Sequence, residues 1–302
     1  MTDDLAAMQR FAAEGVVIDR GPGGLPRVAI DRGGATGEVF LHGATVTRWR
    51  APGAAEVLWV SGSSRWQADA PIRGGIPVCF PWFGPHPTRG DLPAHGFARV
   101  RAWTLVVVEP LAVGARVALE LGDDAATRAL WPHRFRLRLE ATFARELTVA
   151  LTGTVDGGEV ACDAALHTYL AVADVRRVAL HGLAGMTFID KVRAAERQVE
   201  GEAPLRIAGE TDRVYLGTDR AVRLDDPSAR RSLSFTPAGA GATVVWNPWI
   251  DKAKRMPDFG DDEWPGMICV ETANAADAGW RLGATPRTMR VTIAAAATTA
   301  AR

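Results

Sequence analysis

The sequence predicts an all-β fold, an antiparallel sandwich or barrel, and three observations support this prediction. Short apolar or alternating runs recur along the chain, separated by glycine, proline and aspartate. Apolar and polar side chains alternate through residues 134–143, and a second alternating run follows at residues 147–155, which is typical of a β-hairpin. Few segments between these runs have helical spacing, which argues against a doubly wound α/β fold.

The first segment is the exception to this pattern. Residues 3–14 place Leu5, Met8 and Phe11 at helical spacing before the stop signal Gly15, which predicts a short N-terminal helix. Further strands are expected at residues 38–41, 57–60, 103–108, 116–121, 222–224, 232–235, 243–246 and 289–293.

The domain organisation follows from the absence of breaks in this pattern. No linker or fixed-period repeat divides the chain, so we expect a helical segment at residues 1–15 and one domain at 16–293. Residues 294–302 are a low-complexity Ala/Thr stretch, and we expect them to form a disordered tail.

Composition excludes several classes of protein. The 302 residues are 47% hydrophobic and carry 35 basic and 35 acidic side chains, without the basic excess that a nucleic-acid-binding protein usually has. No apolar run approaches the roughly 18 residues of a membrane helix, and no signal peptide is evident. The three cysteines lack metal-ligand spacing and are odd in number, so we expect reduced thiols in the cytoplasm.

Residues 72–99 form the densest unusual segment, rich in glycine, proline, aromatic side chains and cations. Pro77 and Pro81 disfavour a central strand or helix, so we predict an ordered loop of the kind that often lines binding sites. Arg73 precedes a Gly-Gly pair that would let the backbone approach a ligand. Arg73 and Arg99 together suit a phosphate or carboxylate, although each alone is more often a surface salt-bridge partner.

Two predicted strands carry candidate acid–base residues. His167 shares a strand face with Tyr169, and imidazole exchanges protons near neutral pH, although a histidine at such a position is more often structural. Glu271 ends an apolar run at residues 266–272, where a carboxylate costs several kcal/mol of desolvation unless it is paired. Burial would raise its pKa toward a useful range, and the alternative is a core glutamate satisfied by an arginine.

The remaining candidates are weaker. Asp212 could accept hydrogen bonds from sugar hydroxyls or could cap a turn. Residues 246–249 and the cations after them, including Lys252 and Arg255, are expected to form an aromatic and basic loop at the rim of a site. The sequence contains no P-loop, dinucleotide fingerprint or nucleophile elbow, and no ligand-spaced His/Cys pair that would indicate a metal.

Taken together, these segments resemble the aldose 1-epimerase superfamily and, within it, the hexose-6-phosphate mutarotase branch. The matching segments span about residues 37 to 280 and are, in chain order, GATVTRW (43–49), RGGIPVCFPWFGPH (73–86), LPAHGFAR (92–99) followed by Trp103, LHTYL (166–170), TDRVY (211–215), WNPW (246–249) and DFGDDEWPGMICVETANA (258–275).

The resemblance implies a fold and an activity. It implies a single-domain antiparallel β-supersandwich of the galactose mutarotase-like type, with an open sugar cleft and with no cofactor and no metal. The implied activity is that of an isomerase interconverting the α and β anomers of an aldohexose 6-phosphate such as glucose 6-phosphate. By this resemblance His167 would be the general acid and Glu271 the general base. From the chemistry of ring opening we expect Glu271 to start as carboxylate and His167 as imidazolium.

The resemblance also implies substrate-binding residues. Arg73, Arg99 and Asp212 would bind the substrate, and His95 would lie beside its reacting end. Some relatives carry a polar residue just before this histidine, where the present chain has Ala94.

We expect a monomer that takes a small sugar phosphate and no nucleic acid or membrane. The alternatives are an aldose 1-epimerase acting on free sugars, a non-catalytic sugar-phosphate-binding protein and, least favoured, a polysaccharide lyase.

Overall fold

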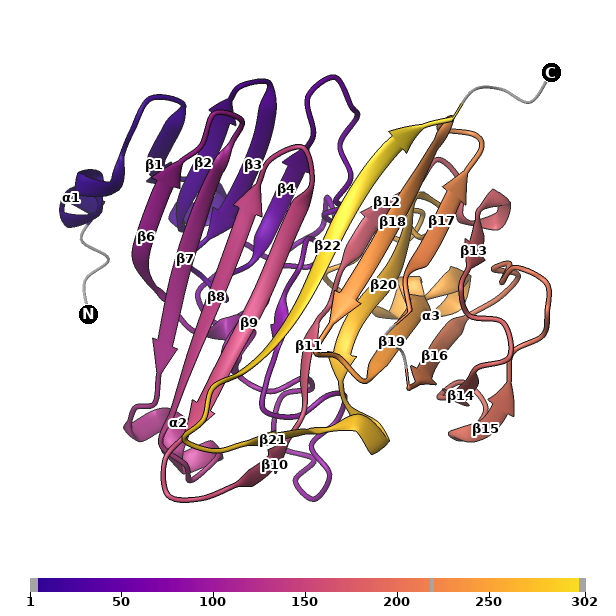
Figure 1. Ribbon diagram of the computed structural model, residues 1–302. Coiled ribbons are helices and arrows are strands. Elements are labelled where there is room, and N and C mark those ends of the chain that lie inside the picture. Colours follow the sequence, from indigo (N-terminus) through magenta and orange to yellow (C-terminus); the bar gives the residue numbers. More distant parts are fainter. Residues whose placement is uncertain (1–4, 218–219, 299–302) are drawn as a thin grey trace.

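Antiparallel sheets make up most of the regular structure, as the alternating runs predict (Figure 1). The computed structural model describes residues 5–217 and 220–298. Within these residues the strands form two eight-stranded sheets, one four-stranded sheet and one two-stranded sheet, and neighbouring strands in every sheet are antiparallel. The all-β prediction is therefore confirmed.

The first eight-stranded sheet contains the predicted hairpin. Its strands, in spatial order, are β13 (Ala179–His181), β17 (Val222–Asp226), β18 (Arg231–Ala238), β22 (Arg287–Ala297), β9 (Leu147–Val155), β8 (Phe135–Phe143), β7 (Ala115–Gly122) and β6 (Thr104–Pro110). β8 and β9 pair from Phe135↔Val155 to Phe143↔Leu147, with alternating buried and less buried positions along both strands. The long strand β22, yellow in Figure 1, joins the two halves of this sheet.

The second eight-stranded sheet carries the segments that the sequence marked as functional. Its strands, in spatial order, are β15 (Glu196–Val199), β14 (Thr187–Asp190), β16 (Thr211–Leu216), β19 (Ala242–Asn247), β20 (Met267–Asn274), β11 (Ala164–Leu166) and β5 (Val78–Cys79), while β12 (Tyr169–Ala171) also pairs with β20. β20 is buried along its whole length.

The smaller sheets complete the fold. The four-stranded sheet consists of β1 (Val16–Arg20), β2 (Pro26–Arg32), β3 (Ala35–Phe40) and β4 (Val46–Arg50), and β10 (Val160–Cys162) pairs with β21 (Trp280–Leu282). Gly37 of β3 lies against the ring of Phe143, where an added Cβ would come within 2.3 Å of the ring. The four-stranded sheet thus packs closely on β8.

Helices are few and short in the described part of the chain: α1 (Leu5–Met8), α2 (Ala125–Leu130) and α3 (Trp249–Arg255), with 3-10 turns at Gln9–Phe11, Pro22–Gly24, Ala98–Val100, Val175–Arg177, Trp264–Gly266 and Ala276–Ala278. The N-terminal helix is shorter than predicted, and residues 1–4 lie outside the described residues. The aromatic and basic segment predicted as a loop is instead largely α3, whose first backbone N–H, that of Trp249, donates to Asn247 Oδ1 (2.9 Å).

Two further predictions are corrected. Residues 294–297 are the end of β22 rather than part of a disordered tail, because their backbone pairs with β18 from Ser234↔Ala294 to Arg231↔Ala297. Residues 299–302 lie outside the described residues. The predicted strand at 57–60 is reduced to isolated bridges, Leu58 to Leu170 and Val60 to Gly74.

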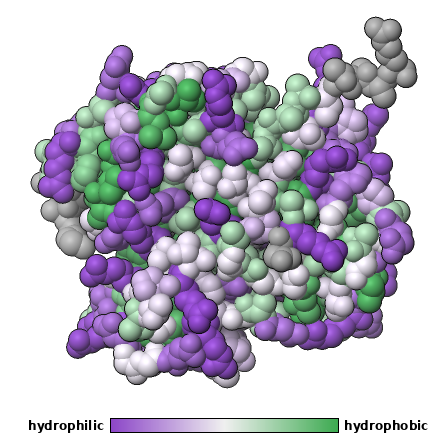
Figure 2. Space-filling view, viewed as in Figure 1, coloured by the Kyte–Doolittle hydropathy of each residue, from purple (hydrophilic) through white to green (hydrophobic). Residues whose placement is uncertain are grey.

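The sheets enclose a core of buried apolar side chains, to which both eight-stranded sheets contribute. On the face shown in Figure 2, hydrophilic residues are spread among hydrophobic ones. Within the described residues, no helix is long and apolar enough to cross a membrane.

Candidate active site

A pocket of about 280 Å³ brings together the six residues assigned to catalysis and substrate binding. Its lining includes Arg73, His95, Arg99, His167, Asp212 and Glu271. These residues come from segments far apart in the sequence, so only the folded sheet and the loop at residues 72–99 place them together.

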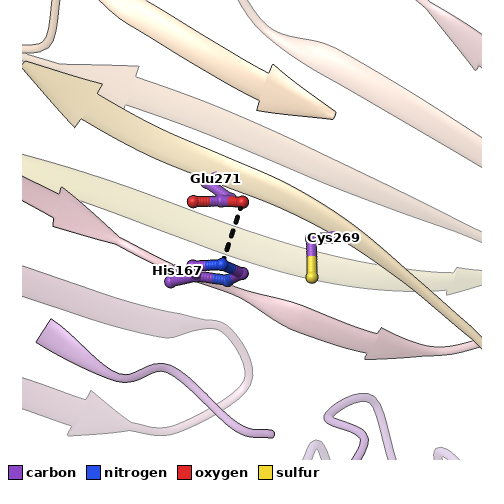
Figure 3. A group of neighbouring side chains, drawn as sticks. All are labelled: His167, Cys269 and Glu271. Carbon is purple, nitrogen blue, oxygen red and sulfur yellow. Dashed lines mark ion pairs between the residues drawn. The ribbon is translucent and has the colours of Figure 1, made fainter. Parts of the chain in front are cut away.

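His167 and Glu271 meet at the inner wall of this pocket. His167 Nε2 lies 3.3 Å from Glu271 Oε1, and Figure 3 shows the two side chains facing each other. His167 occupies the break between β11 and β12, where its backbone N–H donates to Pro77 O (3.0 Å). Glu271 lies on β20, which pairs with both β11 and β12, and the Val270 N–H donates to Thr168 O across this break. The break in the strand therefore turns the imidazole toward the carboxyl group.

Burial decides the protonation of this pair. Glu271 is 1% exposed and His167 6%, and neither His167 Nδ1 nor Glu271 Oε2 has a hydrogen-bond partner among the described residues. Desolvation raises the pKa of Glu271 well above its usual value and lowers the pKa of His167 well below it. Both groups are thus driven toward their neutral forms in the free site, which differs from the expected starting pair of carboxylate and imidazolium.

The ring of His167 is held by aromatic neighbours. It stacks on Tyr169, with ring centroids 4.6 Å apart and planes at 12°, and it meets Trp246 edge-on. The two rings lie side by side as expected, but His167 itself lies in the break between β11 and β12 and not on a strand. The Tyr169 hydroxyl accepts a hydrogen bond from Arg73 Nη1 (3.0 Å), so the stacking partner is itself fixed.

His95 lies next to the pair, with its ring centroid 5.6 Å from that of His167. The Gly84 N–H donates to His95 Nδ1 (3.3 Å), so this nitrogen acts as the acceptor and the ring proton belongs on Nε2. Burial, followed by the charge of Arg99, lowers the pKa of His95 well below its usual value. His95 is therefore a neutral hydrogen-bond donor toward the pocket.

The two arginines differ in how their charge is balanced. Arg73 donates to Asp258 Oδ2 (3.0 Å) as well as to Tyr169, and it has a structural ion pair. Arg99 donates to the Ala94 carbonyl (2.7 Å) but has no carboxylate within 4.0 Å among the described residues. Because desolvation of Arg99 is not offset by an acid, its pKa is lowered. A half-buried guanidinium without an acid partner among the described residues is the feature of this pocket that most favours binding of an anion.

The Gly-Gly pair after Arg73 serves the protein backbone rather than a ligand. A Cβ on Gly74 would lie 2.4 Å from Trp59 O, and one on Gly75 would lie 2.1 Å from Val46 O. Both residues also have positive φ, 125° and 67°, which favours glycine. The expectation of a close approach to ligand at these residues is wrong, because another chain segment fills the space.

Lys191 is the pocket residue that sequence reasoning missed. Its Nζ lies 4.4 Å from the centroid of the Phe83 ring, and no carboxylate lies within 4.0 Å of it among the described residues. The chain has three lysines, and two of them, Lys191 and Lys252, line this pocket. Lys252 pairs with Glu210 (2.9 Å), whereas Arg255 is not among the lining residues. The rarity of lysine in this chain is the one sequence feature that could have drawn attention to Lys191.

Asp212 faces the same space from β16. Burial raises the pKa of its carboxyl group, and Lys191 and Lys252 act in the opposite direction. Its backbone carbonyl accepts from the Lys191 N–H (2.8 Å), which ties the turn after β14 to the pocket. A carboxylate at this position can accept hydrogen bonds from sugar hydroxyls.

Larger pockets elsewhere on the protein are less suited to acid–base chemistry. One of about 490 Å³ and one of about 890 Å³ contain none of the six residues. The larger includes a pair between His181 and Asp225 (3.0 Å), but both side chains are about one-third exposed and Arg223 shares the same carboxylate. Solvent screens such a pair, and this makes it an ordinary surface ion pair.

The comparisons with known proteins agree with this fold. Residues 26–282 match the family model described as aldose 1-epimerase. A protein of Cenchrus ciliaris is 36% identical over 265 residues, covering 83% of this chain and 79% of that protein, and one of Escherichia coli K12 is 35% identical, covering 84% of each; both are named "Putative glucose-6-phosphate 1-epimerase". The crystal structure of a "putative mutarotase" from Salmonella typhimurium superimposes with a TM-score of 0.89 at 30% identity, covering 97% of this chain and 99% of that one.

The antiparallel sheets and the polar pocket define a class, the galactose mutarotase-like β-sandwich isomerases of carbohydrate metabolism. The chain belongs to the aldose 1-epimerase family.

Proposed function

We propose that this protein interconverts the α and β anomers of an aldohexose 6-phosphate, such as glucose 6-phosphate, with His167 and Glu271 as the acid–base pair. The observation that carries the proposal is the 3.3 Å approach of His167 Nε2 to Glu271 Oε1 in a pocket that also holds Arg99, a cation without an acid partner among the described residues. The names of the two relatives above support the choice of a phosphorylated hexose.

The geometry of anomerisation explains why acid and base are neighbours. The reaction removes the proton of the C1 hydroxyl and protonates the ring oxygen, and both oxygens are bonded to the same carbon. A base and an acid must therefore reach two adjacent atoms, and groups 3.3 Å apart are placed to do so. After the ring opens to the aldehyde, rotation about the C1–C2 bond and reclosure give the other anomer.

The proton transfers of ring opening depend on the burial of His167 and Glu271. Ring opening moves one proton from the C1 hydroxyl to Glu271 and one from His167 to the ring oxygen. The pair thus passes from carboxylate and imidazolium to carboxylic acid and neutral imidazole without a net change in protons. Because burial favours the neutral forms, forming the ionised pair before ring opening costs free energy, and ring opening returns both groups to the forms that burial favours. Reclosure returns both protons.

The remaining pocket residues fit the two ends of the substrate. His95, as a neutral donor beside His167, would hydrogen-bond the sugar near its reacting end, and Asp212 would accept from its hydroxyls. Arg99, with Arg73 and Lys191 nearby in the lining, would bind the phosphate. The Ala94 side chain offers no polar contact, but its carbonyl orients the Arg99 guanidinium.

The quaternary state and compartment complete the proposal. All the residues assigned here come from one chain, so a monomer would suffice for activity. The three cysteines are free and buried, which suits the reducing cytoplasm.

The test is the rate of glucose 6-phosphate anomerisation, followed by polarimetry, in Glu271→Gln and His167→Asn. Each change removes a proton-transferring group from a buried position while keeping similar shape, so each should slow the reaction by about 10²- to 10⁴-fold. His181→Asn, in the exposed pair, is the matched control and should retain the wild-type rate. Circular dichroism would establish that the variants are folded, and a near wild-type rate in either pocket variant would refute these roles.

A further inference from the structure

One side chain beside the proposed acid–base pair has no part in the mechanism. Cys269 lies two residues before Glu271 on β20 and is fully buried. One ligand atom from each of His167, Cys269 and Glu271 lies within 4.8 Å of the other two, and Figure 3 shows the thiol next to the pair. Imidazole, thiolate and carboxylate are all ligands of Zn²⁺.

From this arrangement we propose that His167, Cys269 and Glu271 form a Zn²⁺-binding site, and that Zn²⁺ bound there inhibits the enzyme by occupying its acid and base. The binding stands independently of the proposed function, whereas the inhibition rests on it. The metal is an inhibitor in this proposal and not a resident cofactor.

The distances match a tetrahedral site with little adjustment. With bonds of about 2.0–2.2 Å, two N or O ligands of a tetrahedral Zn²⁺ lie about 3.3–3.5 Å apart. His167 Nε2 and Glu271 Oε1 are already 3.3 Å apart. With a Zn–S bond of about 2.3 Å, the sulfur belongs about 3.6 Å from the other ligand atoms. The sulfur lies within 4.8 Å of one ring nitrogen of His167 and one carboxylate oxygen of Glu271, so a displacement of about 1 Å would complete three ligands.

The charge balance also favours a dication here. Binding forms Zn–N, Zn–S and Zn–O bonds, and the thiol and carboxyl protons leave to solvent, so a thiolate, a carboxylate and a neutral imidazole surround the metal. The net charge of this group is zero, so the nearby cations Arg99 and Lys191 do not face an added charge. Glu271 Oε2 and His167 Nδ1 are buried and have no hydrogen-bond partner among the described residues. Both side chains therefore retain unused hydrogen-bonding capacity.

The fourth coordination position would face the pocket, because His167 and Glu271 line it and Cys269 does not. Water would occupy this position in the free site. A metal held there would prevent both proton transfers and would compete with the sugar, so substrate should protect against inhibition.

The experiment compares the chelator-treated wild-type protein with Cys269→Ser and Cys269→Ala. Isothermal titration calorimetry with Zn²⁺ measures binding, and glucose 6-phosphate anomerisation measures inhibition. Co²⁺ serves as a spectroscopic probe because a thiolate ligand gives a sulfur-to-cobalt absorption in the near ultraviolet. Cys162→Ser is the matched control, since Cys162 is also free and buried but lies on β10, outside this group of ligands.

We expect one Zn²⁺ per wild-type chain, inhibition reversed by chelator, and a sulfur-to-cobalt band. Both Cys269 variants should keep the metal-free rate, bind Zn²⁺ at least about tenfold more weakly and lack the band, while Cys162→Ser behaves as wild type. Absence of Zn²⁺ binding by the wild type, or unchanged binding in folded Cys269 variants, would overturn the site. An inactive protein that still binds Zn²⁺ through Cys269 would instead remove the proposed function and leave the site intact.

Discussion

Replacing Arg99 by methionine should separate phosphate recognition from the rest of catalysis. The guanidinium is half-buried, donates to the Ala94 carbonyl and has no acid partner among the described residues, so its charge is available to a substrate anion. Methionine keeps the apolar stem but removes the charge. We therefore expect Arg99→Met to reduce activity on glucose 6-phosphate far more than activity on glucose.

The size of the effect follows from the hydrogen bond that the guanidinium would donate to the phosphate. A hydrogen bond involving charged groups is worth about 1.5–3 kcal/mol. At about 1.4 kcal/mol for each factor of ten, kcat/KM for glucose 6-phosphate should fall about 10- to 150-fold. The value for glucose should change less than about threefold, because glucose has no phosphate for Arg99 to bind.

The assay is NMR exchange spectroscopy of the two anomers, with each sugar over a range of concentrations. Arg89→Met is the matched control, since Arg89 is in the same loop but exposed and paired with Asp91 (2.8 Å). Thermal unfolding gives a second readout: removal of the Arg99 charge should not lower the midpoint, because its burial is not offset by an ion pair. Equal decreases on both sugars would refute the reasoning and would make Arg99 a residue that shapes the pocket.

Three further changes test the structure around the site. Asp258→Ala removes the acid that holds a pocket arginine and should lower the free energy of unfolding by about 1–3 kcal/mol in urea titrations; an unchanged stability would mean that the pair is not formed. Gly96→Ala places a Cβ 1.9 Å from Phe80 O at a φ of 71° and should displace the adjacent His95, with loss of both stability and activity; normal activity would contradict this packing. Leu139→Ala, in the centre of β8 and fully buried, should cost about 2–5 kcal/mol without altering KM, and a decrease below about 1 kcal/mol would be inconsistent with a packed core.

The sequence predicts best where one face of a strand is buried. Strict alternation over residues 134–155 identified β8, β9 and their hairpin, because the side-chain period of two is visible locally. The α3 helix was missed because seven residues after a proline show too little periodicity to be distinguished from a loop. The end of β22 was missed since a run of alanines has no apolar pattern, and its pairing with β18 supplies the strand.

Residue chemistry proposed five of the six site residues, the resemblance gave them roles and added His95, and only the structure gave the electrostatics of the site. Nothing local to His167 or Glu271 indicates that they lie 3.3 Å apart, because a break between two strands and a neighbouring strand together bring them close. Lys191 belongs to a turn without any motif, and only the tertiary fold brings it to Phe83. Likewise, no acidic side chain among the described residues forms an ion pair with Arg99. This depends on the tertiary fold and cannot be read from the local sequence.

The central claim is that His167 and Glu271 act together on one substrate, and a double-variant cycle of anomer exchange rates tests it most directly. Measured with glucose 6-phosphate, Glu271→Gln and His167→Asn should each slow exchange by about 10²- to 10⁴-fold. The double variant should be slower than the slower single variant by no more than about threefold, because the effects of two groups that serve one transition state are not additive. If the two rate decreases multiplied in the double variant, or if either single variant kept the wild-type rate, the claim that His167 and Glu271 act together would be contradicted.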